Sequence, residues 1–353
     1  MTTPLSVQDP DGRASNARPL RVDVLLPTHN RAELVGRTLD TLLAARRPDG
    51  LQARVIVVDN NSRDATRAVV EERARRGAEV GLPIVYLFEP RAGKSHALNT
   101  GVAATDCDVI GMIDDDEDVE PRWFEAIAQA FATPGVDYIT GPCLPRWEID
   151  PPRWLAAEYD PVLGLFYEGD RILGMPDEYR GQMMGGNAAV RRALLMSAGG
   201  YDASLGPSES TRQLSCEDSE MHERLRRLGA RGQYRPDFII LHFVPRTRLE
   251  KRYHRRWHFW HGVSLGVLDR KAPHDVPYAL GVPRFMVGEA VRDLLGLLGL
   301  RRLPGDRPRE ARRFGATLRL LGVAGFWYGR NRFRPAAAPA SPATASVSAG
   351  APA

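Results

Sequence analysis

The sequence predicts an α/β protein with a mostly parallel central sheet covered by helices and a helical extension toward the C-terminal end. Two observations lead to this prediction. Short apolar runs rich in β-branched residues alternate with segments of helical periodicity through the first third of the chain. These runs are almost continuously apolar, which is typical of parallel strands that are buried on both faces.

Four strands are expected in this region, at residues 21–27, 55–59, 84–88 and 109–113. Helices are expected between them, because helical patterns begin near residues 34, 64 and 93. Further strands are expected at 136–141 and 238–242, and a helix is expected from residue 217 to near residue 229. Residues 142–180 are rich in aromatic side chains and are expected to be irregular.

The fourth apolar run ends abruptly in three carboxylates, Asp114, Asp115 and Asp116. Adjacent carboxylates repel one another and cannot be buried without partners, so we expect them at the exit of the strand. Because side chains alternate along a strand, Asp114 and Asp116 should point to the same side. Such a pair suits Mg²⁺ or Mn²⁺, which are typically bound by one or two carboxylates and by substrate phosphates. A solvated acidic turn is the alternative interpretation.

Other polar residues fall at or just beyond the ends of the expected strands: Thr28, Asn30, Asp59 and Lys94. In parallel sheets covered by helices, ligands bind beyond the carboxyl ends of the strands. The chain has no GxGxxG after the first strand and no GxxxxGK[ST]. These absences argue against a dinucleotide dehydrogenase and a P-loop NTPase. The sequence therefore predicts a nucleotide site of another kind.

The composition fits a folded protein of 353 residues, with 43% hydrophobic residues and a formal net charge of +4. The three cysteines lack the spacing of a disulfide framework or a zinc site, which indicates a reducing compartment. We see no signal-peptide pattern and no apolar run of the roughly 18–20 residues that a spanning helix needs. We expect a disordered leader at 1–18, the main α/β domain at 19–262, a basic amphipathic helical extension at 263–334, and a disordered Pro/Ala/Ser tail at 335–353.

Three motifs resemble the signature of inverting family 2 glycosyltransferases: Leu-Pro-Thr-His-Asn-Arg at 26–31, Val-Val-Asp-Asn-Asn-Ser at 57–62 and Ile-Asp-Asp-Asp at 113–116. The pairs Gly186-Asn187 and Glu217-Asp218 are also similar to motifs of that family, and the segment 185–190 resembles its strand beside the donor sugar and acceptor. The resemblance covers roughly residues 22–261. It implies a GT-A fold, a nucleotide-sugar donor and a divalent metal at a DxD motif.

Carried over residue by residue, the resemblance implies a set of donor-binding side chains: Thr28, Asn30, Arg31, Asp59, Lys94, Asp114, Asp115 and Asn187. It implies that Asp59 accepts a hydrogen bond from the base and that Lys94 lies near the base or the diphosphate. Asp116 is the expected metal ligand, together with Asp114 and His242. Simpler roles remain open, because Asp59 suits a helix N-cap and Lys94 a solvated helix start.

The resemblance also implies that Asp218 is the general base. A carboxylate at a helix N-terminus is favoured by the helix dipole, so Glu217 and Asp218 could instead only stabilise the start of their helix. His242 follows an apolar run at 238–241, where many family members have a histidine that reaches the metal. A structural role is the alternative for His242.

The spacing of apolar residues in 277–334 predicts amphipathic helices whose apolar faces are bordered by arginines. This pattern suits an anionic membrane surface. Packing onto the catalytic domain explains it equally well. Nucleic-acid binding is not expected, because no recognition module is present and the central domain is lined by acids.

These observations predict an inverting, metal-dependent (Mn²⁺ or Mg²⁺) glycosyltransferase. It would move a sugar from a UDP-, GDP- or dTDP-sugar to a saccharide or lipid-linked acceptor, in bacterial cell-surface polysaccharide or glycoconjugate synthesis. The expected location is the cytoplasm, with peripheral attachment to the inner face of the membrane. The alternatives are a nucleotidyltransferase of related fold and a non-catalytic protein that binds sugar nucleotides.

Overall fold

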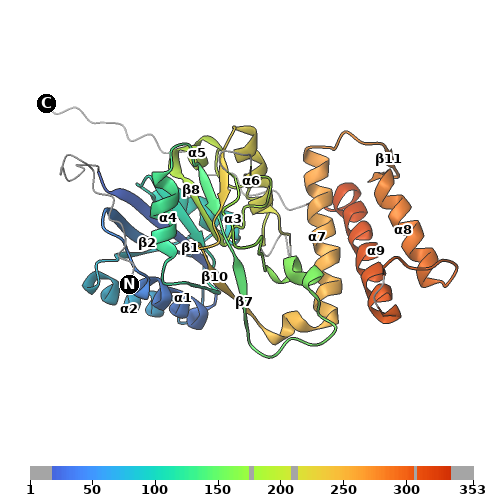
Figure 1. The fold of residues 1–353 in the computed structure, drawn as a ribbon, viewed down its shortest axis with the longest axis horizontal. Helices are drawn as coiled ribbons and strands as arrows, with labels where there is room; N and C mark the ends of the chain where they lie inside the picture. Colours follow the sequence, from blue (N-terminus) through green and yellow to red (C-terminus); the bar gives the residue numbers. More distant parts are fainter. Residues whose placement is uncertain (1–17, 175–178, 208–213, 306–307, 335–353) are drawn as a thin grey trace, which may run out of the picture.

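The computed structural model describes residues 18–174, 179–207, 214–305 and 308–334. The predicted tail, and the predicted leader up to residue 17, lie outside the described residues. The described chain forms an α/β unit around a seven-stranded sheet, with three long helices at one end (Figure 1).

The first half of the sheet is parallel, as predicted. Its strands are β1 (Leu20–Thr28), β2 (Leu51–Asp59), β3 (Ile84–Phe88) and β4 (Val109–Ile113). They lie in the order β3-β2-β1-β4, so that β1 pairs in parallel with both β2 and β4. Because consecutive strands run in the same direction, the residues that follow them gather at one edge of the sheet.

The second half of the chain completes this sheet and builds another. Strands β8 (Asn187–Arg191), β6 (Tyr138–Thr140) and β9 (Gly232–Tyr234) extend the sheet beyond β4, and β8 is antiparallel to both of its neighbours. A separate three-stranded sheet has the order β5-β10-β7, with β5 at Glu117–Val119, β7 at Cys143–Trp147 and β10 at Ile240–Val244. Only three residues separate the end of β4 from the start of β5, so the three aspartates lie in a turn between the two sheets.

Helices cover both faces of the large sheet. The side chains of Val22, Val24 and Leu26 pack on one face against α1 (Ala32–Ala44), α2 (Thr66–Glu79) and α4 (Trp123–Ala132). Leu25 points to the other face, where the core includes α3 (Lys94–Ala104), α5 (Arg192–Ser197) and α6 (Glu217–Arg227). Strand β1 is therefore buried on both faces, which explains its continuous apolar sequence.

Two segments differ from the prediction. His242 was expected at the end of a strand at 238–242, but it lies in the middle of β10. This strand begins only at Ile240, which pairs with Val119 of β5 and Cys143 of β7. Residues 142–180, expected to be irregular, contain β7 and the 3₁₀ helix η1 (Ala157–Leu163). The short helix η2 (Arg246–Leu249) follows β10.

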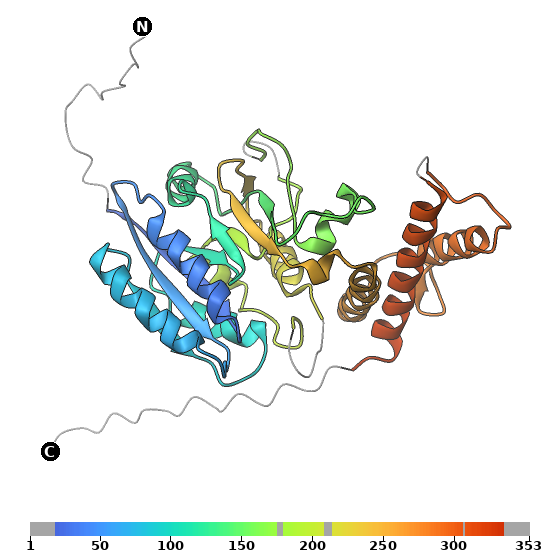
Figure 2. The same cartoon turned by 90° about the horizontal axis from the view of Figure 1, so that it is seen from below.

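The C-terminal region consists of α7 (Lys251–Lys271), α8 (Arg284–Leu297) and α9 (Arg309–Asn331), with a small hairpin of β11 (Tyr278–Ala279) and β12 (Val282–Pro283) before α8. Helix α9 packs between α7 and α8, and both views place α8 farthest from the sheet (Figures 1 and 2). The predicted domain boundary at 262–263 falls inside α7, which runs through it without a break. No helix in the described part of the chain is long and apolar enough to cross a membrane.

Glycines allow the backbones of α7 and α9 to touch. A Cβ added to Gly325 would lie 2.0 Å from the carbonyl oxygen of Phe259, and one added to Gly329 would lie 2.1 Å from that of Val263. Gly262 and Gly266 of α7 make similarly close approaches to the backbone of α9. Helices can come this close only where side chains are absent.

We expect Gly325→Ala to destabilise the protein, because the new methyl group cannot fit against the backbone of α7. Overpacking of this kind typically costs about 1–3 kcal/mol, and thermal unfolding measures it. Gly315→Ala in the same helix is the matched control, since the nearest atom to its added Cβ is a flexible arginine terminus at 3.5 Å. The control should be neutral or stabilising, by up to about 1 kcal/mol. Equal melting temperatures for the two variants would contradict the close approach.

Candidate functional site

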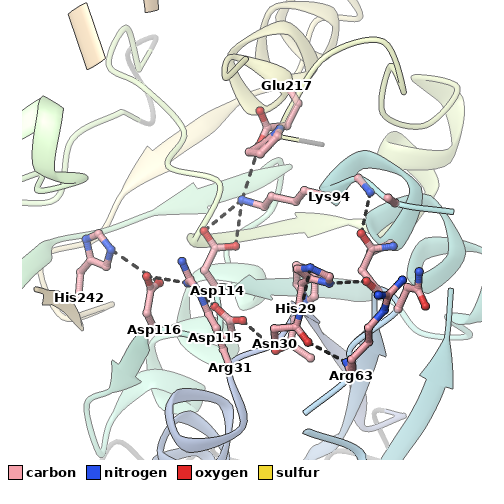
Figure 3. Close-up of a pocket in the computed structure, with 18 of the residues that line it drawn as sticks. His29, Asn30, Arg31, Arg63, Lys94, Asp114, Asp115, Asp116, Glu217 and His242 are labelled. Carbon is pink, nitrogen blue, oxygen red and sulfur yellow. Dashed lines mark hydrogen bonds and ion pairs between the residues drawn. The ribbon is translucent and has the colours of Figure 1, made fainter. Parts of the chain in front are cut away.

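A pocket of about 840 Å³ lies at the carboxyl ends of the parallel strands (Figure 3). Most of the residues predicted from the sequence line it: Thr28, Asn30, Arg31, Lys94, Asp114, Asp115, Asp116 and His242. Strands β1 and β4 end at this edge, and α3 begins there. The parallel topology therefore brings together Thr28, Lys94 and Asp114, and His242 joins them from β10 of the second sheet.

Arg31 lies between two of the three adjacent aspartates. Its Nη1 atom is 2.7 Å from Asp115 Oδ1 and 2.9 Å from Asp116 Oδ2. The hydroxyl of Thr28 donates a second hydrogen bond to Asp115, at 2.8 Å. Burial raises the pKa of Asp115 to about 6, although the positive charge of Arg31 partly opposes this shift. Arg31 and Thr28 thus hold the central aspartate in place.

Asp116 faces the second sheet. Its Oδ1 atom is 3.6 Å from His242 Nε2, and its Oδ2 atom is 3.5 Å from Arg248 of η2. Burial raises the pKa of Asp116, but His242, Arg31 and Arg248 outweigh that effect and hold the pKa below its usual range. The Nδ1 atom of His242 is buried and has no hydrogen-bond partner among the residues that the structure describes. Asp116 and His242 therefore form a carboxylate–imidazole pair beside the pocket (Figure 3).

Asp114 does not share that environment, which differs from the prediction that Asp114 and Asp116 point to the same side. Its Oδ1 atom is 2.9 Å from Lys94 Nζ, on the opposite side of the acidic turn from His242 (Figure 3). The alternation rule fails here because β4 ends at Ile113, and the aspartates lie in a turn rather than in a strand. The backbone N–H of Asp114 donates to Glu117 Oε2 at 2.8 Å, which tightens this turn.

Lys94 connects the acidic turn to the start of α6. Its ammonium group is 2.9 Å from Asp114, 3.6 Å from Glu217 and 3.7 Å from Asp218. Burial lowers the pKa of Lys94, but the three carboxylates outweigh it and raise the pKa well above its ordinary value. Lys94 is therefore a charged group that neutralises several acids, and not the solvated lysine of the alternative interpretation.

Glu217 and Asp218 begin α6. The N-cap residue of this helix is Cys216, whose side chain makes no capping hydrogen bond. Glu217 is buried and lines the pocket, and burial raises its pKa to about 7. Asp218 lies beside the pocket, and burial likewise raises its pKa. A Cβ at Gly185 would fall 2.0 Å from Asp218 Oδ2, so the glycine makes room for this carboxylate.

Two predicted donor contacts do not line the pocket. Asp59 is buried and accepts hydrogen bonds from the Ser62 N–H and the Tyr86 hydroxyl, so it holds the turn after β2. Asn187 is fully buried, and its amide is bonded to Trp123 Nε1 and to the carbonyl oxygens of Pro142 and Phe238. This placement ties β8, α4 and the second sheet together, and it favours a structural role for Asn187.

The structure adds residues that the sequence did not single out. Arg248 reaches Asp116 from η2, and its Nη1 atom is 3.1 Å from His242 Nε2. Glu117 is buried beside Gly186, where a Cβ would come within 2.2 Å of its carboxylate, and burial raises its pKa well above the usual range. Glu117 directly follows the three aspartates, so the sequence could have identified it as a site residue. The sequence around Arg248 contains no motif that predicts a place in the site.

Comparison with known proteins identifies the chain. The family described as glycosyl transferase family 2 matches residues 23–197. The chain belongs to this glycosyltransferase family. The succinoglycan biosynthesis protein ExoM of Rhizobium meliloti is 26% identical over 265 residues, which cover 74% of this chain and 80% of ExoM. The glucosyl-dolichyl phosphate glucuronosyltransferase of Haloferax volcanii is 25% identical over 260 residues, or 72% of this chain and 79% of that enzyme.

A solved structure supports the same fold for this family 2 glycosyltransferase. The mannosyltransferase PcManGT from Pyrobaculum calidifontis, in complex with GDP-Man and Mn²⁺, superposes with a TM-score of 0.54. The match covers 89% of this chain and 88% of that one, at 23% identity. The fold is therefore GT-A, as the motifs implied. The family match ends at residue 197, before Asp218 and His242, so their roles rest on the geometry of this site.

We expect Asn187→Ala to lower stability and to leave nucleotide binding by the folded protein unchanged. The substitution removes the partner of the Trp123 N–H and of the Phe238 carbonyl, at about 1–3 kcal/mol for each buried group. The Pro142 carbonyl also loses a bond but still accepts one from the Ile240 N–H. Thermal melting and calorimetry with UDP and GDP measure the two effects separately. Wild-type stability combined with weakened donor binding would instead support the donor contact predicted from the sequence.

Proposed function

We propose that this glycosyltransferase is inverting and metal-dependent, and that it transfers a sugar from a nucleoside-diphosphate donor to an acceptor hydroxyl. The observation that carries the proposal is the division of the acidic site. Asp116 and His242 lie on one side, and Lys94, Glu217 and Asp218 lie on the other. The first group suits a cation and the diphosphate, and the second suits proton removal from the acceptor.

The residues of the first group fit a divalent metal. Carboxylate oxygen and imidazole nitrogen both bind Mn²⁺, and Asp116 Oδ1 and His242 Nε2 are close enough to share one ion. No cluster of three or more potential ligands stands ready in the described ranges of the chain. An ion of this kind is typically held by one or two protein groups and by the phosphates of the substrate. When bound, it would supply positive charge to the leaving diphosphate. The structure of PcManGT, which contains GDP-Man and Mn²⁺, supports this proposal.

Asp218 is the proposed general base. It takes the proton of the acceptor hydroxyl while the hydroxyl oxygen forms a bond to the anomeric carbon. The bond between that carbon and the diphosphate breaks on the opposite face, and the electron pair leaves with the nucleoside diphosphate. A raised pKa suits this role, because a base is most effective when its pKa is near the working pH. Lys94 positions the carboxylate and balances its charge.

The donor nucleotide is proposed to bind along β1 and the turn after β2. Asn30 has a left-handed backbone conformation, with φ of 52°, and its side-chain oxygen accepts a hydrogen bond from the Arg63 N–H. This contact joins the two loops that would enclose the base. Thr28 and Arg31 line the same pocket, where both contact Asp115 of the acidic turn. Arg31 lies beside Asp115 and Asp116, and it is proposed to contact a diphosphate bound at the acidic turn.

The biological setting is proposed from the names of relatives and from the cysteines. ExoM is a succinoglycan biosynthesis protein, and the Haloferax enzyme is named for a lipid-linked substrate. A role in cell-surface polysaccharide or glycoconjugate synthesis fits both. The three cysteines are buried and unpaired, which favours the cytoplasm.

A panel of UDP-, GDP- and dTDP-sugars, scored for released nucleoside diphosphate, identifies the donor. Synthesis of a nucleotide sugar from an NTP would instead indicate the nucleotidyltransferase.

We expect Asp116→Ala to abolish metal-dependent donor binding, because the variant loses the carboxylate that would join the ion to the protein. Calorimetry with UDP or GDP, with and without Mn²⁺, tests this expectation. The metal-independent part of the affinity serves as the internal control and should change little. An unchanged Mn²⁺ effect in the variant would remove Asp116 from the metal site.

We expect Asp218→Asn to keep its fold and donor affinity, because asparagine preserves the shape of the side chain. Turnover should fall by about 10²–10⁴-fold, the usual contribution of an acid–base group. Glu223→Gln in the same helix is the matched control, since that residue is exposed and pairs only with Arg227 among the contacts shown. Wild-type turnover in Asp218→Asn would exclude it as the base, and Glu217→Gln would then be tested.

A further inference from the structure

The outward face of α8 is apolar although it is exposed. Val287, Val291, Leu294 and Leu298 recur at spacings of three and four residues, so they form one stripe along the helix. Val291, Leu294 and Leu298 are 52%, 49% and 64% exposed. Surface helices normally place charged residues on such a face, and an apolar stripe open to water indicates an interaction surface.

The opposite side of α8 is already satisfied within the protein. Asp293 is completely buried, and Arg319 of α9 binds its two carboxylate oxygens at 2.7 and 2.8 Å. Gly296 is also buried, and a Cβ there would meet the Leu303 side chain at 2.2 Å. Because this side of α8 is fixed against α9, the apolar stripe cannot turn inward to cover itself.

The charge around the stripe is positive. Arg284 begins α8, and Arg301 and Arg302 follow it, all with exposed side chains. At 100° per residue, Glu289 lies on the far side of the helix from Leu294 and Leu298. Leu280 and Leu300, which precede and follow α8, are 91% and 73% exposed. Apolar side chains flanked by arginines match the boundary between the acyl chains and the headgroups of an anionic bilayer.

We propose that α8 lies on the surface of an anionic lipid bilayer, with Val291, Leu294 and Leu298 inserted among the acyl chains and Arg284, Arg301 and Arg302 at the phosphate groups. This inference does not depend on the proposed catalytic mechanism. A second copy of the chain fits the face less well, because pairing two such stripes brings clusters of arginines together. The position of α8 at the far end of the molecule leaves this face open to a flat surface (Figures 1 and 2).

Co-sedimentation of the full chain with vesicles tests the proposal. We expect binding to vesicles that contain phosphatidylglycerol, weaker binding at high salt, and little binding to pure phosphatidylcholine. The double variant Leu294→Glu/Leu298→Glu should lose at least about tenfold in vesicle affinity. Equal binding to both lipids, no binding to either, or wild-type binding by this variant would overturn the proposal.

Matched variants separate this surface from general effects of charge. Val80→Glu/Ile149→Glu changes two side chains that are 49% and 51% exposed elsewhere on the molecule, and it should bind vesicles like the wild type. Arg301→Gln/Arg302→Gln should bind more weakly, whereas Arg75→Gln/Arg153→Gln should not. Sedimentation velocity provides the test against a second copy. A dimer that is abolished by Leu294→Glu/Leu298→Glu would overturn the lipid assignment.

A fluorescent probe keeps the proposal testable if the glutamate variants fold poorly. The three native cysteines are buried, so an environment-sensitive dye attached to Leu294→Cys labels α8 selectively. Its emission should shift to shorter wavelength with phosphatidylglycerol vesicles. The same dye on Val80→Cys should not respond. An unresponsive dye at position 294 under conditions of full vesicle binding would show that another surface binds the lipid.

Discussion

An excess of buried negative charge at the carboxyl end of β4 governs the whole site. Six carboxylates gather there: Asp114, Asp115, Asp116, Glu117, Glu217 and Asp218. Lys94, Arg31 and Arg248 approach them, and each of these cations contacts more than one acid or a histidine. Burial raises the pKa values of Asp115, Glu117 and Glu217, and repulsion from neighbouring acids raises them further. A nucleoside diphosphate is itself an anion, so this negative charge is one physical reason for the divalent cation proposed above.

The elements that the sequence predicted well depend on local patterns. Strands β1 to β4 are apolar on both faces, and β1, β2 and β3 are each followed by a polar turn and a helix, so their type and their parallel direction could be predicted. The gathering of Thr28, Lys94 and Asp114 to Asp116 followed from that topology. Residues 142–180 were harder, because β7 exists only through its pairing with β10, almost one hundred residues later.

The placements that could not be predicted from the sequence share one physical cause. Whether a polar residue faces a pocket or the core depends on partners that are distant in the chain. The donor contact of Asn187 stays a prediction, and the sequence could not show that its amide bonds to Trp123 and to two carbonyl groups from other parts of the chain. His242 was assigned to a strand end because its pairing with Glu117 of β5 could not be seen. Arg248 lies in a 3₁₀ turn without a motif, and only the fold brings it to Asp116.

The helical extension is physically continuous with the site. His254 near the start of α7 is fully buried, and its Nε2 atom is 3.1 Å from the carbonyl oxygen of Arg248. The same imidazole contacts the rings of Trp154 and Tyr159, which also pack against Phe314 of α9. The turn that carries Arg248 therefore rests on α7, and α7 rests on α9 through backbone contact at glycines. Because α8 is fixed to α9 by the ion pair between the buried Asp293 and Arg319, one packed framework joins the exposed face of α8 to the acidic pocket.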